Sequence, residues 1–420
     1  MKDQNIIIIS LDEVRPDHLS CYGYQSISTP AIDQIASEGV KFNQCFSSAD
    51  FTPIAMGSVI TGKYPNKHGV RNAYSYLASP TIATILKEEG YRTAGFVGNG
   101  LLAKRHGFAQ GFDFFNETSK DTSWLEIQYP NSGNDEIIYE GNYWVEEFFS
   151  WLKNNYQQKF FVWGHLYETH EGSGDSLVNR GLIKKGESPE FDYYNAKIKM
   201  ADEKLVGRLI STLKELSIYD NTTIVLMSDH GTNLGEHPVK DIPWRKKGTC
   251  YPQHTTMYDH DLHVAMMIKG KDLPQGKVIQ GMVRSIDLIP TLLEHIDIST
   301  QAYDFDGQSW LPLLKQDQDR NEIYSEDLFE PRGLGALQSL RTPEYKLMRN
   351  LTLGQESYFD LKNDPDEQKD IKENIDQEKL IKIRKKLNSY LFTKVVSQKG
   401  FNKGEKEVIN QRLRALGYIE

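Results

Sequence analysis

Short, fully apolar runs that end in charged side chains are the clearest pattern along the chain. Two such runs, with the pairs that follow them, are Ile6–Leu11 with Asp12 and Glu13, and Thr223–Ser228 with Asp229 and His230. Runs without polar alternation are typical of parallel strands that are buried on both faces. Because ligands bind beyond the carboxyl ends of such strands, we expect these four polar side chains to meet at one site.

Helical stretches alternate with apolar strands as far as Ile296. The expected helices are Ala31–Gly39, Pro53–Thr61, Thr81–Glu89, Asn195–Leu216 and Ser285–Ile296. Further strands are expected over Arg92–Val97, Phe160–His165 and Val264–Ile268. This alternation predicts the α/β class, with a mostly parallel sheet sandwiched by helices.

The pattern changes beyond Lys315. Short alternating segments joined by turn-rich sequence predict antiparallel strands, followed by a charged helix over Gln377–Leu391. These strands are expected over Asn321–Asp327, Ala336–Leu340, Tyr345–Asn350 and Ser357–Leu361. We therefore expect a catalytic domain over residues 1–315 and a small α+β subdomain over residues 316–420.

Composition and charge narrow the class of protein. The 420 residues are 39% hydrophobic and 25% charged, as in a globular protein. A net charge of −9 argues against a general nucleic-acid binder. No segment approaches the ~20 apolar residues of a membrane span. Three cysteines and an N-terminus without a signal-peptide pattern predict a cytoplasmic protein.

The polar pairs at the strand ends are of metal-ligand type. Asp12, Asp229 and His230 offer oxygen and nitrogen donors, a set that suits Zn, Mn or Ca. Neighbouring side chains on a strand point to opposite faces, so Glu13 can join Asp12 only if the backbone has already turned. The sequence therefore predicts one divalent metal site and leaves a second site open.

Thr52 precedes Pro53 and an expected helix. One interpretation is a helix N-cap followed by proline at the first helical position. A second interpretation adds catalysis, because a hydroxyl at a helix N-terminus lies where the dipole favours an anion, and a metal would lower the pKa of that hydroxyl. Local sequence leaves both interpretations open.

The ordered set of motifs resembles the sulfatase family of the alkaline phosphatase superfamily over almost the whole chain. The segments that carry the resemblance are Leu11–Leu19 with Cys21–Gly23, Ser58–Pro65 with His68–Val70, Ser228–Gly231 with Leu234–His237, Asp287–Leu293, Asp306–Ser309 and Tyr358–Leu361. The resemblance implies an alkaline-phosphatase-like fold with metal ligands at Asp12, Glu13, Asp229 and His230. Counting back from Thr61 and Gly62, it places the nucleophile at Thr52.

Several positions depart from the family pattern. Sulfatases carry a Cys or Ser that is converted to formylglycine, followed by Pro and Arg, whereas this chain has Thr52, Ile54 and Met56. A Gly-Lys-x-His segment that holds sulfate corresponds to Gly98–Leu101, and a further lysine corresponds to His254. Since these sulfate-binding features are missing together, we expect a metal-dependent hydrolase of a phosphodiester, phosphomonoester or phosphonate, with a covalent intermediate on Thr52.

Three alternatives to this reaction remain. They are a sulfuric ester hydrolase that uses the unmodified threonine, a phospho-group transferase, and a non-catalytic relative that binds an anion. In each enzymatic case we expect a small-molecule or glycan ester as the substrate. Self-association into a homo-oligomer is left open.

Two histidines are expected to take part in the reaction. The resemblance makes His170 the residue that contacts the transferred group or protonates the leaving oxygen, a role suited to its pKa near neutrality. His254 is expected to do the same, or to bind a second metal together with Glu168 or His170.

Three further residues are candidates for substrate binding. They are Arg15, Asn99 and His165. Arg15 follows the candidate metal ligands Asp12 and Glu13, and it can instead brace the metal-binding loop. His165 ends an apolar strand and can instead be a buried histidine with satisfied hydrogen bonds.

Overall fold

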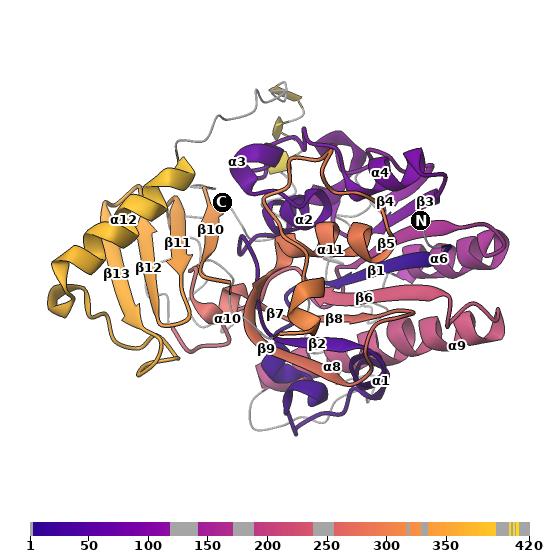
Figure 1. Ribbon diagram of the computed structural model, residues 1–420, viewed down its shortest axis with the longest axis horizontal. Helices are drawn as coiled ribbons and strands as arrows, with labels where there is room; N and C mark the ends of the chain where they lie inside the picture. Colours follow the sequence, from indigo (N-terminus) through magenta and orange to yellow (C-terminus); the bar gives the residue numbers. More distant parts are fainter. Residues whose placement is uncertain are drawn as a thin grey trace, which may run out of the picture.

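The computed structural model describes residues 3–117, 142–170, 189–237, 256–316, 320–328 and 335–391, and a few positions between 403 and 410. Figure 1 shows a large sheet covered by helices and a smaller sheet beside it. Within the described residues, the large sheet has nine strands in the order β4-β3-β5-β1-β6-β8-β2-β7, with β9 paired to β2. The fold is therefore the expected α/β sandwich with a small C-terminal antiparallel sheet.

The centre of the large sheet is parallel, as predicted. The parallel strands on this side are β1 (Asn5–Leu11), β3 (Arg92–Val97), β4 (Phe114–Glu117), β5 (Phe160–Leu166) and β6 (Thr222–Ser228). All seven residues of β1 are buried, and so are all seven of β6. Continuous apolar runs form here because both faces of the sheet are covered by helices.

The other side of the sheet is mixed. Its strands are β2 (Val40–Phe46), β7 (His263–Val264), β8 (Met266–Lys269) and β9 (Lys277–Arg284). The expected strand over Val264–Ile268 is divided into β7 and β8, which run antiparallel to β2. Strands β2, β4 and β9 were not predicted. β2 and β9 include half-buried or exposed polar residues, which mask the apolar signal of a strand.

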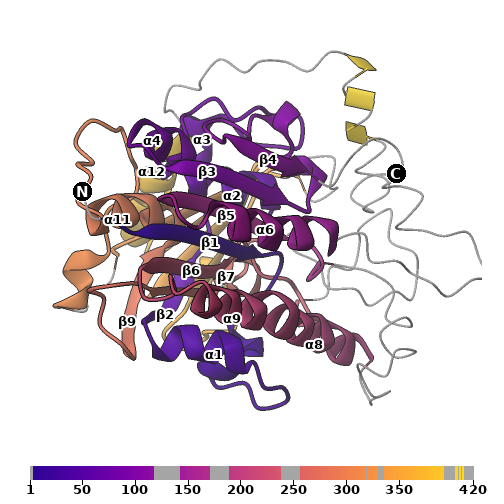
Figure 2. The same cartoon turned by 90° about the vertical axis from the view of Figure 1, so that its right-hand side faces the viewer.

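Helices pack on both faces of the sheet (Figure 2). Ile6 and Ile8 of β1 belong to a core that includes α2, α4 and α11, whereas Ile7 and Ile9 belong to a core that includes α1, α6, α8 and α9. The helices of the first face are α2 (Thr52–Thr61), α4 (Ile82–Glu88) and α11 (Leu288–His295). Those of the second are α1 (Pro30–Ser37), α6 (Asn142–Asn155), α8 (Pro189–Ala201) and α9 (Arg208–Glu215).

The long helix predicted over Asn195–Leu216 has a different shape. It begins earlier, as α8, and a π-helical turn over Asp202–Gly207 separates it from α9. The side chain of Asp202 in this turn accepts a hydrogen bond from the backbone N–H of Ile32 at 2.7 Å, so the turn is fixed against α1. Within the part of the chain that the structure describes, no helix is long and apolar enough to cross a bilayer.

The smaller sheet is an antiparallel meander covered by one helix. Its strands are β10 (Ile323–Asp327), β11 (Leu337–Arg341), β12 (Tyr345–Asn350) and β13 (Gln355–Asp360), and the helix is α12 (Gln377–Leu391). This agrees with the predicted C-terminal α+β region. The predicted boundary after residue 315 stays a prediction.

A buried ion pair joins the smaller sheet to the loop that follows His68. Arg71 donates to both carboxylate oxygens of Glu326 at 2.7 Å, and the Glu326 side chain is fully buried on β10. The backbone N–H of Glu326 also donates to the carbonyl of Ser48, four residues before Thr52. The smaller sheet therefore stabilises the segment that leads into α2.

We expect Arg71→Met to lower the free energy of unfolding by about 3–5 kcal/mol, because it leaves the Glu326 carboxylate buried without its cation. Chemical denaturation followed by circular dichroism measures this change. The double variant Arg71→Met/Glu326→Gln is the control and should recover much of the loss. Equal stability of the single variant and the wild type would show that the pair does not stabilise the contact between the smaller sheet and the loop after His68.

Candidate active site

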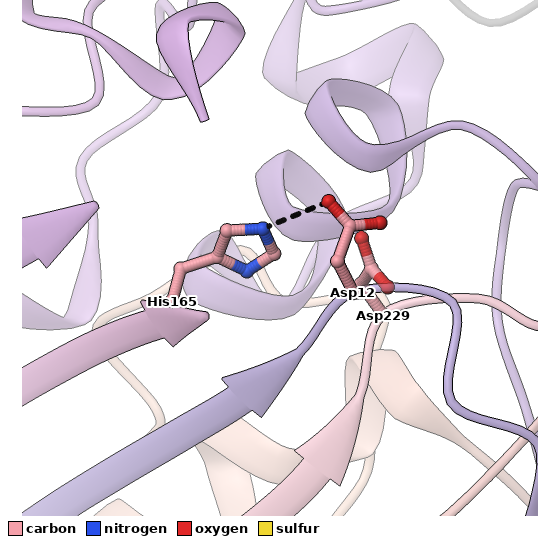
Figure 3. Close-up of side chains that lie close together, drawn as sticks. All are labelled: Asp12, His165 and Asp229. Atoms are coloured by element: carbon pink, nitrogen blue, oxygen red, sulfur yellow. Dashed lines mark hydrogen bonds and ion pairs between the residues drawn. The ribbon is translucent and has the colours of Figure 1, made fainter. Parts of the chain in front are cut away.

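Three acidic or histidine side chains converge at the carboxyl edge of the large sheet. In the register of the central strands, Leu11 of β1 lies beside Leu166 of β5 and Ser228 of β6. Asp12, His165 and Asp229 therefore lie side by side, as Figure 3 shows, and all three side chains are fully buried. The Nε2 atom of His165 lies 3.4 Å from Asp12 Oδ2. The predicted meeting of the strand ends agrees with this geometry.

Glu13 lies in a sharp turn of the backbone. Its φ is +60°, an unusual value for a residue other than glycine, and its carbonyl accepts a hydrogen bond from the Tyr194 hydroxyl at 2.6 Å. Its backbone N–H donates to Asp229 Oδ1 at 3.1 Å. The turn brings the Glu13 carboxylate beside Asp12 and within 3.1 Å of His170 Nε2. The backbone has therefore turned before Glu13, as the sequence required if both carboxylates were to bind one metal.

These side chains form two groups with the spacing of metal ligands. Asp12, His165 and Asp229 make one group, and Asp12, Glu13 and His170 make the other, with ligand atoms within 4.8 Å of one another in each. His230 Nε2 lies 3.7 Å from Asp12 Oδ1 and 3.5 Å from Asp229 Oδ2. His165 and His170, which the sequence assigned to substrate and catalysis, thus lie among the candidate ligands.

The electrostatics of the group fit a bound cation. Burial raises the pKa of Asp12 to about 6 and also raises the pKa of Asp229. Asp229 Oδ2 is buried and accepts no hydrogen bond from any residue that the structure describes. Buried carboxylates without compensating donors are unfavourable unless they are protonated or bind a cation. The donor set therefore fits the divalent metal expected from the sequence.

His230 presents a lone pair to the centre of the group. Its Nδ1 lies 2.8 Å from the carbonyl oxygen of Gly231, which can only accept, so Nδ1 carries the proton of the neutral ring. The other nitrogen, Nε2, faces Asp12, Asp229 and the hydroxyl of Thr52, which is 3.2 Å away. A backbone hydrogen bond of this kind is typical of histidines that bind metals.

Thr52 is not the N-cap of its helix. Phe51 occupies that position, and Thr52 and Pro53 are the first two residues of α2. The structure corrects the N-cap interpretation by one residue, since Thr52 already belongs to the first turn of α2. Thr52 Oγ1 instead lies 3.5 Å from Asp12 Oδ1 and 3.2 Å from His230 Nε2.

Asn99 and His165 both lie near Oδ2 of Asp12, whereas Thr52 and His230 lie near its Oδ1. The side-chain amide of Asn99 lies 3.4 Å from Asp12 Oδ2, while its oxygen accepts from the Leu101 N–H. His165 Nδ1 is bonded to Ser10 Oγ at 2.9 Å, and burial lowers the pKa of its ring to about 4. His165 thus has the satisfied hydrogen bonds of the alternative interpretation; its role in binding substrate stays a prediction.

The contacts described for the Arg15 guanidinium do not include Thr52. The guanidinium is held by Asp17 and Glu236 and donates to the carbonyl of Thr232 at 3.1 Å. It lines a cavity of about 800 Å³ beside the smaller sheet. These contacts favour the bracing role over direct binding of the ester. His254, the second predicted catalytic histidine, lies outside the described residues.

Sequence reasoning missed two residues of α8 that reach the site. Tyr194 bonds to both sides of the turn at Glu13, because its oxygen also accepts from the Arg15 N–H at 2.8 Å. Lys197 is buried and donates to the backbone carbonyl of His170. No local signal marks these residues, since their role depends on the packing of α8 beside the loop after β1.

Comparison with known proteins identifies the family. The family model described as Sulfatase matches residues 4–298, which is more than half of the chain. The chain belongs to the sulfatase family. A second model, described as N-sulphoglucosamine sulphohydrolase, C-terminal, matches residues 250–395. Membership makes the protein a hydrolase of ester bonds, as the sequence predicted.

Sulfatases are prominent among the similar proteins. An ulvan-active sulfatase of Formosa agariphila is 26% identical, with 91% of this chain and 81% of that protein aligned. An arylsulfatase of Clostridium perfringens is 22% identical over 90% of this chain and 94% of its own. A structure in complex with its substrate, D-glucosamine-2-N,6-O-disulfate, has a TM-score of 0.71 at 19% identity, covering 93% of this chain and 97% of the other.

The expectation of phosphate-ester chemistry was wrong. The relatives reported above are sulfatases, and one of the structures contains a sulfated sugar as its substrate. A phosphonate monoester hydrolase of Agrobacterium radiobacter also shares the fold, with a TM-score of 0.68 at 19% identity over 91% of this chain and 96% of the other. The loss of basic side chains at positions such as Met56 and Asn99 was a poor guide, because phosphate and sulfate esters both carry anionic oxygens and basic side chains bind either. The sulfuric ester alternative is the better supported one.

Proposed function

We propose that this protein hydrolyses a sulfate ester of a carbohydrate and that the unmodified hydroxyl of Thr52 is the nucleophile. The observation that carries the proposal is the position of Thr52 Oγ1, 3.2 Å from His230 Nε2 and 3.5 Å from Asp12 Oδ1. Sulfatase relatives with known sulfated substrates support the choice of ester.

Each residue of the site has its own role in the proposed reaction. The Thr52 hydroxyl gives its proton to the Asp12 carboxylate, to which it donates at 3.5 Å, and its oxygen attacks sulfur as the bond from sulfur to the leaving oxygen breaks. The carboxylate returns this proton to the Thr52 oxygen when sulfate is released. The positive end of the α2 dipole adjoins the sulfate oxygens. His170 protonates the leaving alcohol, and then removes a proton from the water that attacks sulfur and releases sulfate from Thr52.

Asp12, Asp229 and His230, with Glu13 beside them, would hold the divalent metal. Such an ion supplies positive charge at the sulfate oxygens and lowers the pKa of a nearby hydroxyl. The nitrogen donor of His230 favours Zn or Mn over Ca. A second metal at Asp12, Glu13 and His170, a cytoplasmic location and a homo-oligomer stay predictions.

A panel of esters tests the proposed reaction. Wild-type protein reconstituted with Mn, Zn or Ca is assayed with 4-nitrophenyl sulfate, sulfated monosaccharides and 4-nitrophenyl phosphate. We expect release of sulfate that stops after chelation and returns when the metal is restored. A preference for the phosphate ester with no release of sulfate from any compound would overturn the proposal.

A further inference from the structure

Lys197 is a buried cation at the edge of the active site. Its side chain is only 5% exposed, and its ammonium donates to the backbone carbonyl of His170. Burying an ammonium is costly unless nearby groups compensate its charge. The hydrogen bond to the carbonyl of His170 is one interaction that compensates the buried ammonium of Lys197.

Helix α8 connects this turn to the metal-binding loop. Tyr194 lies three residues before Lys197, so the two side chains share one face of the helix. Tyr194 donates to the carbonyl of Glu13, and Lys197 donates to the carbonyl of His170. One helix face thus fixes the backbones of the two residues whose side chains meet, with His170 Nε2 at 3.1 Å from Glu13 Oε1.

We propose that Lys197 is a positioning residue, which holds the main chain at His170 so that the imidazole can deliver a proton to the leaving oxygen. The ring of His170 is also stacked on Tyr167, with centroids 4.8 Å apart, so the backbone and the ring face are both constrained. This inference rests on the proposed sulfate-ester hydrolysis.

The dependence on the leaving group tests this role. Lys197→Met removes the charge and keeps the length, Lys197→Arg keeps a charged donor, and Lys199→Met is the control because Lys199 is exposed on the same helix. Each protein is assayed with 4-nitrophenyl sulfate, whose leaving group needs little protonation, and with a sulfated monosaccharide, whose alcohol needs it. Metal content is measured in parallel.

If Lys197 positions the acid, Lys197→Met lowers kcat for the sugar sulfate by roughly 10- to 100-fold, part of the 10²–10⁴ typical of general acid catalysis, and changes the aryl sulfate much less. KM and metal content stay near the wild-type values, and Lys197→Arg recovers most of the loss. Adding Lys197→Met to His170→Asn should cause little further loss, because both act on one proton transfer.

Equal losses for both leaving groups, or loss of metal from Lys197→Met, would make Lys197 a structural residue and overturn the inference. Failure of the proposed function gives a different result, since the wild-type protein would then release no sulfate from either ester. In that case the role of Lys197 falls together with the reaction on which it rests.

Discussion

Thr52→Val lowers kcat for sulfate esters by roughly 10⁴-fold or more, because it removes the attacking oxygen and keeps the shape of the side chain. The side chain is fully buried, so an isosteric change should disturb the start of α2 little. Initial rates on the reconstituted enzyme measure the effect. Metal content should remain near that of the wild type, since Asp12, Asp229 and His230 are intact.

Thr52→Ser is the matched control for this loss. It restores a hydroxyl at the same place and should retain at least part of the activity. A Thr52→Val protein that turns over at the wild-type rate would remove Thr52 from the mechanism.

Asp12→Asn should lower the affinity for the metal and raise the stability of the metal-free protein. We expect metal affinity to fall steeply, because Asp12 contributes to both groups of candidate ligands. We also expect the metal-free variant to be more stable than metal-free wild type at pH 7.5, by on the order of 3 kcal/mol, from the rise in the pKa of Asp12 to about 6.

The pH dependence follows from the direction of this shift. The folded protein holds the Asp12 proton more tightly than the unfolded chain. The loss of stability caused by burying the ionised carboxylate is therefore complete above pH 6 and disappears as the pH falls toward 4. Metal-free wild type should therefore gain stability over this range relative to Asp12→Asn. Denaturation at several pH values measures the difference, with the exposed Asp220→Asn as a control. A variant no more stable than wild type at pH 7.5 would show that burial of this carboxylate is not costly.

The ends of the buried strands were the most predictable part of the site. Ile6–Leu11 and the run before Asp229 are mostly apolar, which favours strands of a parallel sheet covered on both faces, and the register of that sheet brings Asp12 and Asp229 together. His165 follows from the same rule, because β5 is paired with β1.

The parts that escaped prediction depend on contacts between distant segments. Tyr194 and Lys197 carry no local pattern, and only the packing of α8 against the loop after β1 gives them a role. The exact start of α2 was not predicted, because a Thr-Pro pair fits either the N-cap or the first turn of a helix. The contacts of Thr52 with Asp12 and His230 join residues that are distant in the sequence, so no local pattern reveals them. The choice between sulfate and phosphate failed for another reason: both esters are anionic, so the missing basic side chains at positions 56 and 99 do not distinguish them.

Mass spectrometry of the peptide that contains Thr52 tests the central claim most directly. The wild-type enzyme is quenched during turnover of a sulfate ester, and the peptide over residues 42–63 is compared with that of the resting enzyme. We predict an unmodified threonine at rest and a fraction of the peptide heavier by one SO₃ group during turnover. An active enzyme whose Thr52 peptide never gains that group, and whose Thr52→Val variant releases sulfate as fast as the wild type, would contradict the account.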